Sequence, residues 1–439
     1  MPSPDRTVFF GSQLGDVLIT NYSYTDSAFL LLLQDAYLCI QYLRNFPSVI
    51  FPLTPCNSGS MNELYPSPGN LTILALQFLL LLFQFVLLIA LLPFATLPVW
   101  VSALYIGIFV LINNLVCWLF LNGPERIYWS HPDLTSFDDQ HSKEQWVFIN
   151  GVSTGCFGYA TRDVRSCYAI IKQILINPDI EKVVLISHSQ GGIITSMVID
   201  WALQELPQDL VRKIEVYTFG NAANHFNSPA RSTTPDNNSS ISQSFDSSSG
   251  NAPSSSLIDP PGNLHMPASR TPNDEPLENI EDRAIYYIEH YAHTTDYVSL
   301  ISVLHFTTLK HPQGHIPNYI GRVFARTSEE TSGHQFVQHY LDGMFPIEKT
   351  ESGQYTAIEE SEFMNSDLYI IEGLEVSKGS LRPINDIGPY EGKLDAPWVA
   401  ESCQDARLTT YNSSEQGRVV KVKDMSRLWR YLNGRTPEQ

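Results

Sequence analysis

The amino-acid sequence predicts an α/β fold, a mostly parallel sheet with helices on both faces, joined to an N-terminal transmembrane helical hairpin. Three observations predict this architecture. Short β-rich apolar segments alternate with segments of helical periodicity between residues 145 and 326, as expected for parallel strands with crossover helices. Two long segments, 71–92 and 99–121, contain no charged residue. At 183–205 a strand, a tight polar turn and a helix follow one another.

The two uncharged segments each reach the roughly 20 residues that a helix needs to cross a bilayer. Pro93 and Pro98 lie in the short connection between them and break the helix there. We therefore predict a membrane hairpin and an integral membrane protein. The alternatives are two buried core helices or one shallow re-entrant hairpin. Gln77, Gln84, Asn113 and Asn114, inside the segments, are candidates to pair the two helices.

The composition excludes some classes of function. The formal net charge is −19, from 27 basic and 46 acidic residues, so we expect no binding of nucleic acid through the overall electrostatic field. None of the six cysteines forms a Cys-x-x-Cys pair. The sequence has no His-Glu-x-x-His, P-loop or Gly-x-Gly-x-x-Gly motif. We expect neither a metal nor another cofactor.

The chain divides into four predicted regions. An N-terminal region covers 1–70, the hairpin covers 71–121, the sheet domain covers 140–346 and a C-terminal extension covers 347–439. Within the sheet domain, residues 227–283 are dominated by Ser, Pro, Asn and Asp, with few apolar residues. Such a composition buries too little surface to offset the chain entropy lost on folding, so we expect a disordered surface insertion.

The predicted strands of the sheet domain are apolar runs bounded by turn residues. The strands are 145–149, 183–186, 213–219, 284–291 and 321–326, and the helices are 164–176 and 190–205. Outside this domain, 28–40 predicts an amphipathic or packed helix too short to span a membrane. A further short helix is expected at 422–435, with Asp424 as its N-cap and Gly434 at its end.

The turn between the second strand and its helix reads Ser187-His188-Ser189-Gln190-Gly191-Gly192. A strand, a sharp turn and a helix can raise one serine above the carboxyl end of a sheet, provided that the residues two before and two after it are small. Ser187 and Gly191 occupy those positions around Ser189. Ser189 is therefore the candidate nucleophile, with an ordinary structural turn as the alternative. The backbone N–H of Gln190 is a candidate oxyanion donor.

A serine hydroxyl becomes a nucleophile when a histidine takes its proton and a carboxylate orients that histidine. In this architecture the chain order is serine, acid, histidine. Asp296 follows the fourth strand and is the candidate acid, with Asp282 and Glu289 as weaker alternatives. His334 follows the fifth strand, ahead of an apolar helix, and is the candidate base. His339, five residues later, is the alternative base.

An oxyanion hole needs a second N–H donor from the loop after the first strand. Asn150-Gly151 opens that loop. We expect the Val152 N–H to be this donor, with the Gly151 N–H as the alternative. The loop could also be an ordinary Gly-rich turn with no role in an oxyanion hole.

Three segments carry a resemblance to known proteins. Residues 187–192 resemble the Gly-His-Ser-x-Gly-Gly turn of α/β-hydrolase lipases, "VYTFGNAANHF" (216–226) resembles the Thr-Phe-Gly-x-Pro-x-x-Gly-Asn strand end of class 3 lipases, and "IEHYAHTTDYV" (288–298) resembles their Asn-x-x-Asp-x-Val acid loop. The chain is also similar to fungal membrane-anchored hydrolase-like proteins without an assigned substrate. The resemblance covers about 145–345 and departs from the lipase pattern at Ser187, Ala222 and Asn150-Gly151.

The resemblance implies an α/β-hydrolase fold with Ser189 as nucleophile, Asp296 as acid and a histidine from "SGHQFVQHYL" as base. Together with the hairpin, it predicts a membrane-anchored serine hydrolase that cleaves a carboxylic ester, with a lipid or other acyl ester as its substrate. Two alternatives stay open. One is an acyltransferase that uses the same three residues, and the other is a catalytically inactive membrane scaffold.

Overall fold

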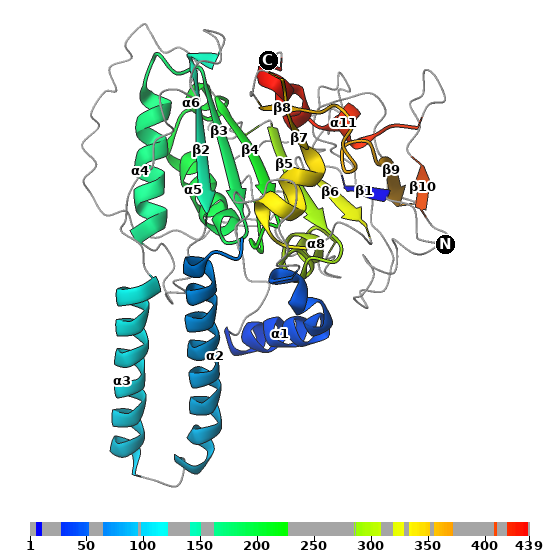
Figure 1. The fold of residues 1–439 in the computed structure, drawn as a ribbon. Coiled ribbons are helices and arrows are strands. Elements are labelled where there is room, and N and C mark those ends of the chain that lie inside the picture. The colour runs from blue at the N-terminus through cyan, green and yellow to red at the C-terminus, as the bar shows by residue number, and fades with distance from the viewer. Residues whose placement is uncertain are drawn as a thin grey trace, which may run out of the picture.

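An eight-stranded, mostly parallel sheet forms the centre of the part of the chain that the structure describes (Figure 1). The structure is a computed structural model and describes residues 6–10, 28–51, 65–94, 98–121, 141–150, 162–226, 285, 287–308, 319–328, 333–351, 355–371, 408–410 and 419–437. The expected disordered insertion, 227–283, lies outside these residues. The strand order is β10-β9-β1-β6-β5-β4-β3-β2.

Five neighbouring strands run parallel, and they correspond to the five strands predicted from the sequence. They are β2 (Glu144–Asn150), β3 (Lys182–His188), β4 (Ile214–Phe219), β5 (Tyr287–His293) and β6 (Arg322–Thr327). Their register aligns His188 with Phe219, Phe219 with Tyr291, and Tyr291 with Phe324. The segments that follow these strands therefore leave the sheet at one edge, its carboxyl edge.

The other three strands come from the two ends of the chain and differ from the prediction. β1 (Arg6–Phe10) pairs antiparallel with β6 and parallel with β9 (Asp367–Ile371), and β10 (Leu408–Thr410) pairs antiparallel with β9. The sheet thus includes strands from the regions that the sequence analysis assigned to 1–70 and 347–439. Each strand has only three to five residues, too few for a clear period-two pattern.

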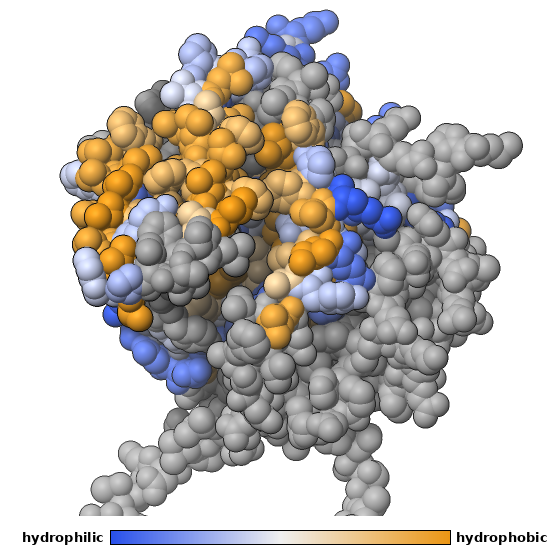
Figure 2. All heavy atoms as spheres, turned by 90° about the horizontal axis from the view of Figure 1, so that it is seen from below, coloured by the Kyte–Doolittle hydropathy of each residue, from blue (hydrophilic) through white to orange (hydrophobic). Residues whose placement is uncertain are grey.

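Two long apolar helices extend away from the sheet as an antiparallel pair (Figure 1). They are α2 (Pro68–Phe94) and α3 (Val99–Val116), which continues as the π-helical turn η3 (Cys117–Leu121). Both are long and apolar enough to cross a membrane, and no residue in their most apolar segments is buried within the protein. As expected, Gln84 Nε2 donates a hydrogen bond to Asn113 Oδ1, at 3.0 Å. Viewed from the hairpin side, the molecule displays a broad hydrophobic surface (Figure 2).

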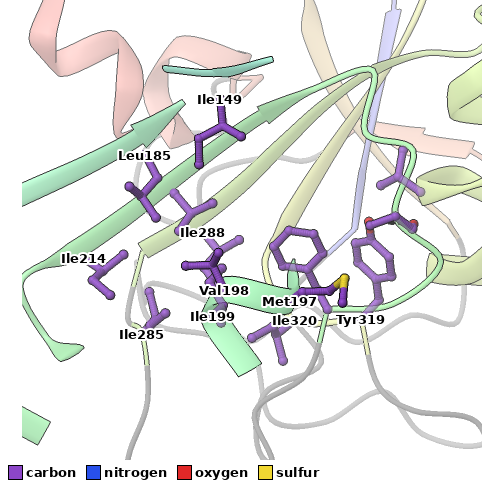
Figure 3. Close-up of a cluster of buried hydrophobic side chains, with 14 of the residues drawn as sticks. Ile149, Leu185, Met197, Val198, Ile199, Ile214, Ile285, Ile288, Tyr319 and Ile320 are labelled. Atoms are coloured by element: carbon purple, nitrogen blue, oxygen red, sulfur yellow. Dashed lines mark hydrogen bonds between the residues drawn. The ribbon is translucent and has the colours of Figure 1, made fainter. Parts of the chain in front are cut away.

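One face of the sheet packs against helices that follow the parallel strands. They are α4 (Arg162–Ile176), α5 (Gly191–Glu205), α6 (Gln208–Val211), α7 (Tyr297–Ile301) and α8 (Val303–Thr308). Four residues at helical spacing in α4 are buried against the sheet: Val164, Tyr168, Ile171 and Leu175. Figure 3 shows part of this core, in which Leu185, Ile214 and Ile288 from adjacent strands meet Val198 and Ile199 of α5.

The opposite face is covered by the buried Phe363 and Met364 and by two longer segments from the C-terminal third of the chain. The first is the π-helical turn η6 (Phe336–Leu341), which continues into α9 (Asp342–Met344). It is followed by the small hairpin of β7 (Ile347–Lys349) and β8 (Tyr355–Ala357). The second is residues 419–437, whose Val422, Leu428 and Tyr431 join the core of this face. Both faces of the sheet are therefore covered, as predicted for an α/β protein.

The C-terminal segment does not form the single helix that was expected over 422–435. It forms α11 (Val422–Met425) and the 3-10 helix η7 (Leu428–Gly434), separated by an extended residue, Ser426. The N-cap of α11 is Lys421 rather than Asp424. The break leaves the N–H groups of Arg427 and Leu428 free to donate to the buried carboxylate of Glu289, at 2.8 and 3.2 Å. Hydrogen bonding to the sheet thus explains the break.

The N-terminal region also contributes two helical elements next to the sheet. They are α1 (Ala28–Gln41), which the sequence predicted, and the 3-10 helix η1 (Leu43–Val49), which it did not. Helix α1 contacts α7, and Leu38 of α1 and the following Tyr42 are buried in the core of this face. Figure 1 shows α1 beneath the carboxyl edge of the parallel strands, on the side from which the hairpin extends.

Candidate active site

Ser189 occupies the turn between β3 and α5 in a strained backbone conformation. Its φ is 54°, in the left-handed region that residues with a side chain rarely adopt. Neighbouring segments hold this conformation: the Ser189 N–H donates to Phe219 O at 3.0 Å, and Ser189 O accepts from the N–H groups of Gly192 and Ala222 at 3.0 and 3.1 Å. The turn points the half-buried Ser189 side chain away from the end of its strand.

The close packing of this turn explains the small residues around Ser189. A Cβ on Gly191 would stand 2.0 Å from the Ile149 carbonyl oxygen of the neighbouring strand, and a Cβ on Gly192 would stand 1.9 Å from Asn221 Oδ1. Neither position has space for a side chain. Ser187, two residues before Ser189, is fully buried. Small residues are therefore a steric requirement of the turn, as the sequence pattern predicted.

The structure brings Ser189 together with the predicted acid and base. Ser189 Oγ lies 2.8 Å from His334 Nε2, and His334 Nδ1 lies 3.0 Å from Asp296 Oδ2. Asp296 follows β5 and caps α7, and His334 lies between β6 and η6. Because an ionised carboxylate only accepts hydrogen bonds, the His334 Nδ1–H donates to Asp296, and Nε2 accepts from the Ser189 hydroxyl. The three side chains form a continuous hydrogen-bonded chain.

Asp296 is fully buried and fully hydrogen-bonded. Its Oδ2 accepts from Ser299 Oγ at 2.8 Å and from Tyr340 OH at 2.9 Å, and its Oδ1 accepts from the Val298 N–H at 2.9 Å. Burial raises the pKa of Asp296, but the neighbouring His334 and these hydrogen bonds outweigh burial and lower the pKa to about 2. The carboxylate therefore carries its negative charge throughout the neutral pH range.

His188 supports the base from the neighbouring strand end. Its Nε2 lies 2.6 Å from the backbone oxygen of His334, and the centroids of the His188 and His334 rings are 4.8 Å apart. Burial and the nearby His334 lower the pKa of His188 to about 3, so it is a neutral hydrogen-bond donor at neutral pH. His188 thus fixes the position of the His334 backbone.

His339, the alternative base, makes a different set of contacts. Its Nδ1 accepts from the Gln335 N–H at 2.9 Å, and its ring packs against Gly333, whose Cβ would stand 2.4 Å from the ring. Burial lowers the pKa of His339 to about 4. Of the two histidines, His334 is the one hydrogen-bonded to Ser189.

The alternative acids are not part of this arrangement. Glu289 is buried within β5 and bonds to the C-terminal segment through Arg427 and Leu428. Asp282 lies outside the described residues. Asp296 is therefore the acid that the described residues bring to His334.

Of the predicted oxyanion donors, the structure describes Gln190 alone. Gln190 is exposed and is the N-cap of α5, and its N–H donates to no acceptor within the described residues. The N-terminal end of a helix also carries a partial positive charge, which favours an anion at this position. Gly151 and Val152 lie outside the described residues, so the second donor stays a prediction.

Gly220 belongs to the site, although the sequence analysis did not nominate it. Its φ is 52°, and a Cβ on it would stand 3.0 Å from both Asp296 Oδ2 and His334 Nδ1. The backbone at the end of β4 therefore packs directly against the hydrogen bond between acid and base. The signal that could have identified Gly220 is its place in the Thr218-Phe219-Gly220 match to the lipase strand end.

Within the part of the chain that the structure describes, no group of three or more His, Cys, Asp or Glu side chains is arranged to hold a metal ion. Comparisons with protein-family models, with curated proteins and with solved structures found no match for this chain.

Proposed function

We propose that the protein is a membrane-anchored serine hydrolase of the α/β-hydrolase type that cleaves a carboxylic ester. The observation that carries the proposal is the 2.8 Å contact between Ser189 Oγ and His334 Nε2, made by a serine whose φ is 54°. Strained backbone of this kind is typical of functional sites, and a hydroxyl within hydrogen-bond reach of an oriented imidazole is the arrangement that nucleophilic catalysis needs.

The proposed reaction begins with attack of Ser189 Oγ on the ester carbonyl carbon. His334 Nε2 takes the hydroxyl proton while the new C–O bond forms, and the carbonyl oxygen becomes an oxyanion that the Gln190 N–H stabilises. As the intermediate collapses, the protonated His334 gives its proton to the departing alcohol, and an acyl-serine remains. Water, deprotonated by His334, then attacks the acyl carbon. The bond between that carbon and Ser189 Oγ breaks, His334 returns the proton to Ser189 Oγ, and the carboxylic acid is released.

Asp296 acts on His334 rather than on the substrate. Its carboxylate accepts the Nδ1–H, which keeps Nε2 free to accept the Ser189 proton. When His334 is protonated, the negative charge of Asp296 stabilises the imidazolium. The low pKa of Asp296, about 2, supports this role because the carboxylate stays ionised at the pH of the reaction.

A lipid ester is the substrate class that the surroundings of the site favour. Helices α2 and α3 suit a membrane by length and composition. They extend from the side of the sheet at which the parallel strands end, so that the carboxyl edge with Ser189 faces the membrane side of the molecule (Figure 1). An anchored enzyme with this orientation meets esters within the bilayer at high local concentration.

The experiment that tests the proposal is ester hydrolysis by the purified full chain in lipid nanodiscs. We expect turnover of a nitrophenyl ester by the wild type, and a loss of roughly 10⁴-fold or more in kcat for Ser189→Ala. Equal rates for the two proteins would overturn the proposal in favour of the inactive scaffold. Added alcohol tests the acyltransferase: if most acyl groups appear as a new ester rather than as free acid, transfer is the reaction.

A further inference from the structure

Helix α1 carries apolar side chains on two opposite faces. Leu38 and Tyr42 are buried in the core beneath the sheet. On the other side Tyr37 and Ile40 are each 69% exposed, and Leu33, one turn earlier on the same side, is 48% exposed. Leu33, Tyr37 and Ile40 are therefore exposed, although they are as apolar as the buried residues of the first face.

The exposed apolar face continues beyond the end of α1 into η1. Leu43, Phe46 and Phe51 are exposed in turn. We call these six residues the α1 face: Leu33, Tyr37, Ile40, Leu43, Phe46 and Phe51. None of these six residues is charged. Arg44, which is exposed and is not one of the six, follows Leu43 in the sequence. Several exposed apolar residues along one short segment suggest a surface that binds something apolar.

The α1 face lies on the membrane side of the molecule. Figure 1 shows α1 below the sheet, at the level of the first turns of α2. Figure 2 shows that hydrophobic side chains gather on this side of the described surface. A bilayer that receives α2 and α3 is therefore within reach of the α1 face, without any movement of one element relative to another. Arg44 suits the phosphate layer at the edge of such a bilayer.

The segment that carries the α1 face is bonded to the loop of the catalytic base. The His334 N–H donates to Ser48 O at 3.2 Å, and Gln335 Nε2 donates to Ile50 O at 2.9 Å. His334 is thus held from two sides, by its own contact with Asp296 and by the backbone of η1.

The same segment is bonded to the loop of the acid. Asn45 Nδ2 and Ser48 Oγ donate to Thr295 O, at 3.2 and 3.1 Å. Phe46 packs edge-on against the Tyr297 ring, with 5.4 Å between ring centroids. Thr295 and Tyr297 flank Asp296, so residues 45–50 contact the loops of both the acid and the base. Whatever surface the α1 face binds is fixed in position relative to Ser189.

We propose that the α1 face docks on the bilayer that α2 and α3 span, and that this contact places Ser189 at the lipid head-group layer, where bilayer esters are its substrates. The inference rests on the proposed hydrolase function and specifies where that hydrolase meets its substrate. The bilayer is the occupant because the neighbouring hairpin keeps lipid next to α1 at all times, whereas a partner protein would have to displace that lipid.

The test compares one reaction on two esters that differ in where they reside. The full chain in nanodiscs is given nitrophenyl acetate in water or a long-chain nitrophenyl ester dissolved in the bilayer. For Tyr37→Glu/Ile40→Glu we expect the long-chain rate to fall by at least about tenfold and the acetate rate to stay within about twofold. The matched control is Ile176→Glu, which changes an exposed residue at the end of α4 that leads to the opposite edge of the sheet. If Tyr37→Glu/Ile40→Glu hydrolyses the bilayer ester at the wild-type rate, the docking inference is overturned.

A second measurement is independent of catalysis. Ile40→p-benzoylphenylalanine, irradiated in the nanodisc, is expected to give phospholipid adducts, and Ile176→p-benzoylphenylalanine is expected to give none. Adducts with protein, or no lipid adduct at position 40, overturn the inference, and this readout decides the case if the double glutamate variant loses both activities. Lipid adducts from a protein that hydrolyses neither ester would instead overturn the proposed function and leave the docking intact.

Discussion

The Nε2 atom of His334 lies 2.8 Å from the Oγ atom of Ser189, although 145 positions separate the two residues in the chain. The contact exists because the strands that precede the two residues belong to one parallel sheet and end at the same edge. Asp296, which follows β5, one of the two strands between them in that sheet, completes the arrangement at 3.0 Å from His334. The sheet thus converts a wide sequence separation into one hydrogen-bonded site.

The assignment of the base predicts different results for two neighbouring histidines. His334→Ala removes the group that accepts the Ser189 proton, and kcat should fall by roughly 10⁴-fold or more. His339→Asn retains an acceptor for the Gln335 N–H, and kcat should stay within about tenfold of the wild type. Steady-state kinetics on a soluble ester measures both. A larger loss in His339→Asn than in His334→Ala would exchange the two roles.

The close packing of Gly220 predicts a loss of activity in a variant that changes no reacting group. Gly220→Ala introduces a Cβ 3.0 Å from Asp296 Oδ2 and from His334 Nδ1, which forces acid and base to move. We expect kcat/KM to fall by about 10²-fold, because small displacements of catalytic groups have effects of this size. The left-handed φ adds a cost in stability of about 1–2 kcal/mol.

Gly107→Ala is the matched control for this substitution, because a Cβ at Gly107 meets nothing within 4 Å. Its kcat/KM should equal that of the wild type. An unchanged kcat/KM in Gly220→Ala would show that the close approach of β4 to the acid and base has no part in catalysis.

The C-terminal segment should contribute strongly to stability through one buried ion pair. Arg427 donates from Nε and NH2 to Glu215 Oε1, at 3.0 and 2.7 Å, and both residues are buried. Arg427→Ala leaves the Glu215 carboxylate buried without its cation, which should lower the free energy of unfolding by about 3–5 kcal/mol. The control is Arg435→Ala, whose pair with Glu359 is exposed, and which should cost less than about 1 kcal/mol. Denaturant unfolding of both variants checks this; equal losses would contradict it.

Much of the fold and of the site could be predicted from the sequence, because the signals were local. The five parallel strands are short β-rich segments, and Ser189, Asp296 and His334 follow three of them in the required order. The close packing between Gly191 and Ile149 explains why the turn displayed small residues at fixed distances from the serine. These features depend on neighbours in the chain or on the ends of regular elements, and both leave a pattern in the sequence.

The remaining features depend on pairings between distant segments. β1 pairs with β6, where Phe9 is aligned with Phe324, and nothing within the first ten residues specifies that partner. The break at Ser426 was missed for the same reason, since the acceptor that explains it, Glu289, lies on β5. Ser48 supports the base through a backbone oxygen, which any residue could supply, so no side-chain pattern marks it.

Buried histidines predict that the fold loses stability in mild acid. Burial lowers the pKa of four buried histidines, His188, His290, His293 and His339, and of the half-buried His305 to about 3 or 4. The unfolded chain binds these protons near pH 6.5, whereas the folded chain binds them only near pH 3–4. The contribution of these neutral histidines to the free energy of unfolding is therefore fully present above about pH 6.5. It is lost as the pH falls towards 4, by at most about 1.4 kcal/mol per pH unit for each histidine.

Thermal unfolding of the full chain in nanodiscs between pH 8 and pH 4.5 measures this trend. We expect the Tm to be constant above pH 7 and to fall continuously below pH 6.5. His290→Gln removes one of the five groups and should make the fall less steep. A Tm that stays constant down to pH 4.5 would mean that these histidines are not held neutral by burial.

The central claim is that Ser189 is a nucleophile activated by His334, and active-site labelling tests it most directly. A fluorophosphonate reacts covalently with an activated serine hydroxyl and needs no knowledge of the substrate. We expect the wild-type chain in nanodiscs to be labelled on the peptide that contains Ser189, and we expect Ser189→Ala to be unlabelled. Labelling of Ser189→Ala to the wild-type extent, or a wild-type chain that remains unlabelled, would contradict the account.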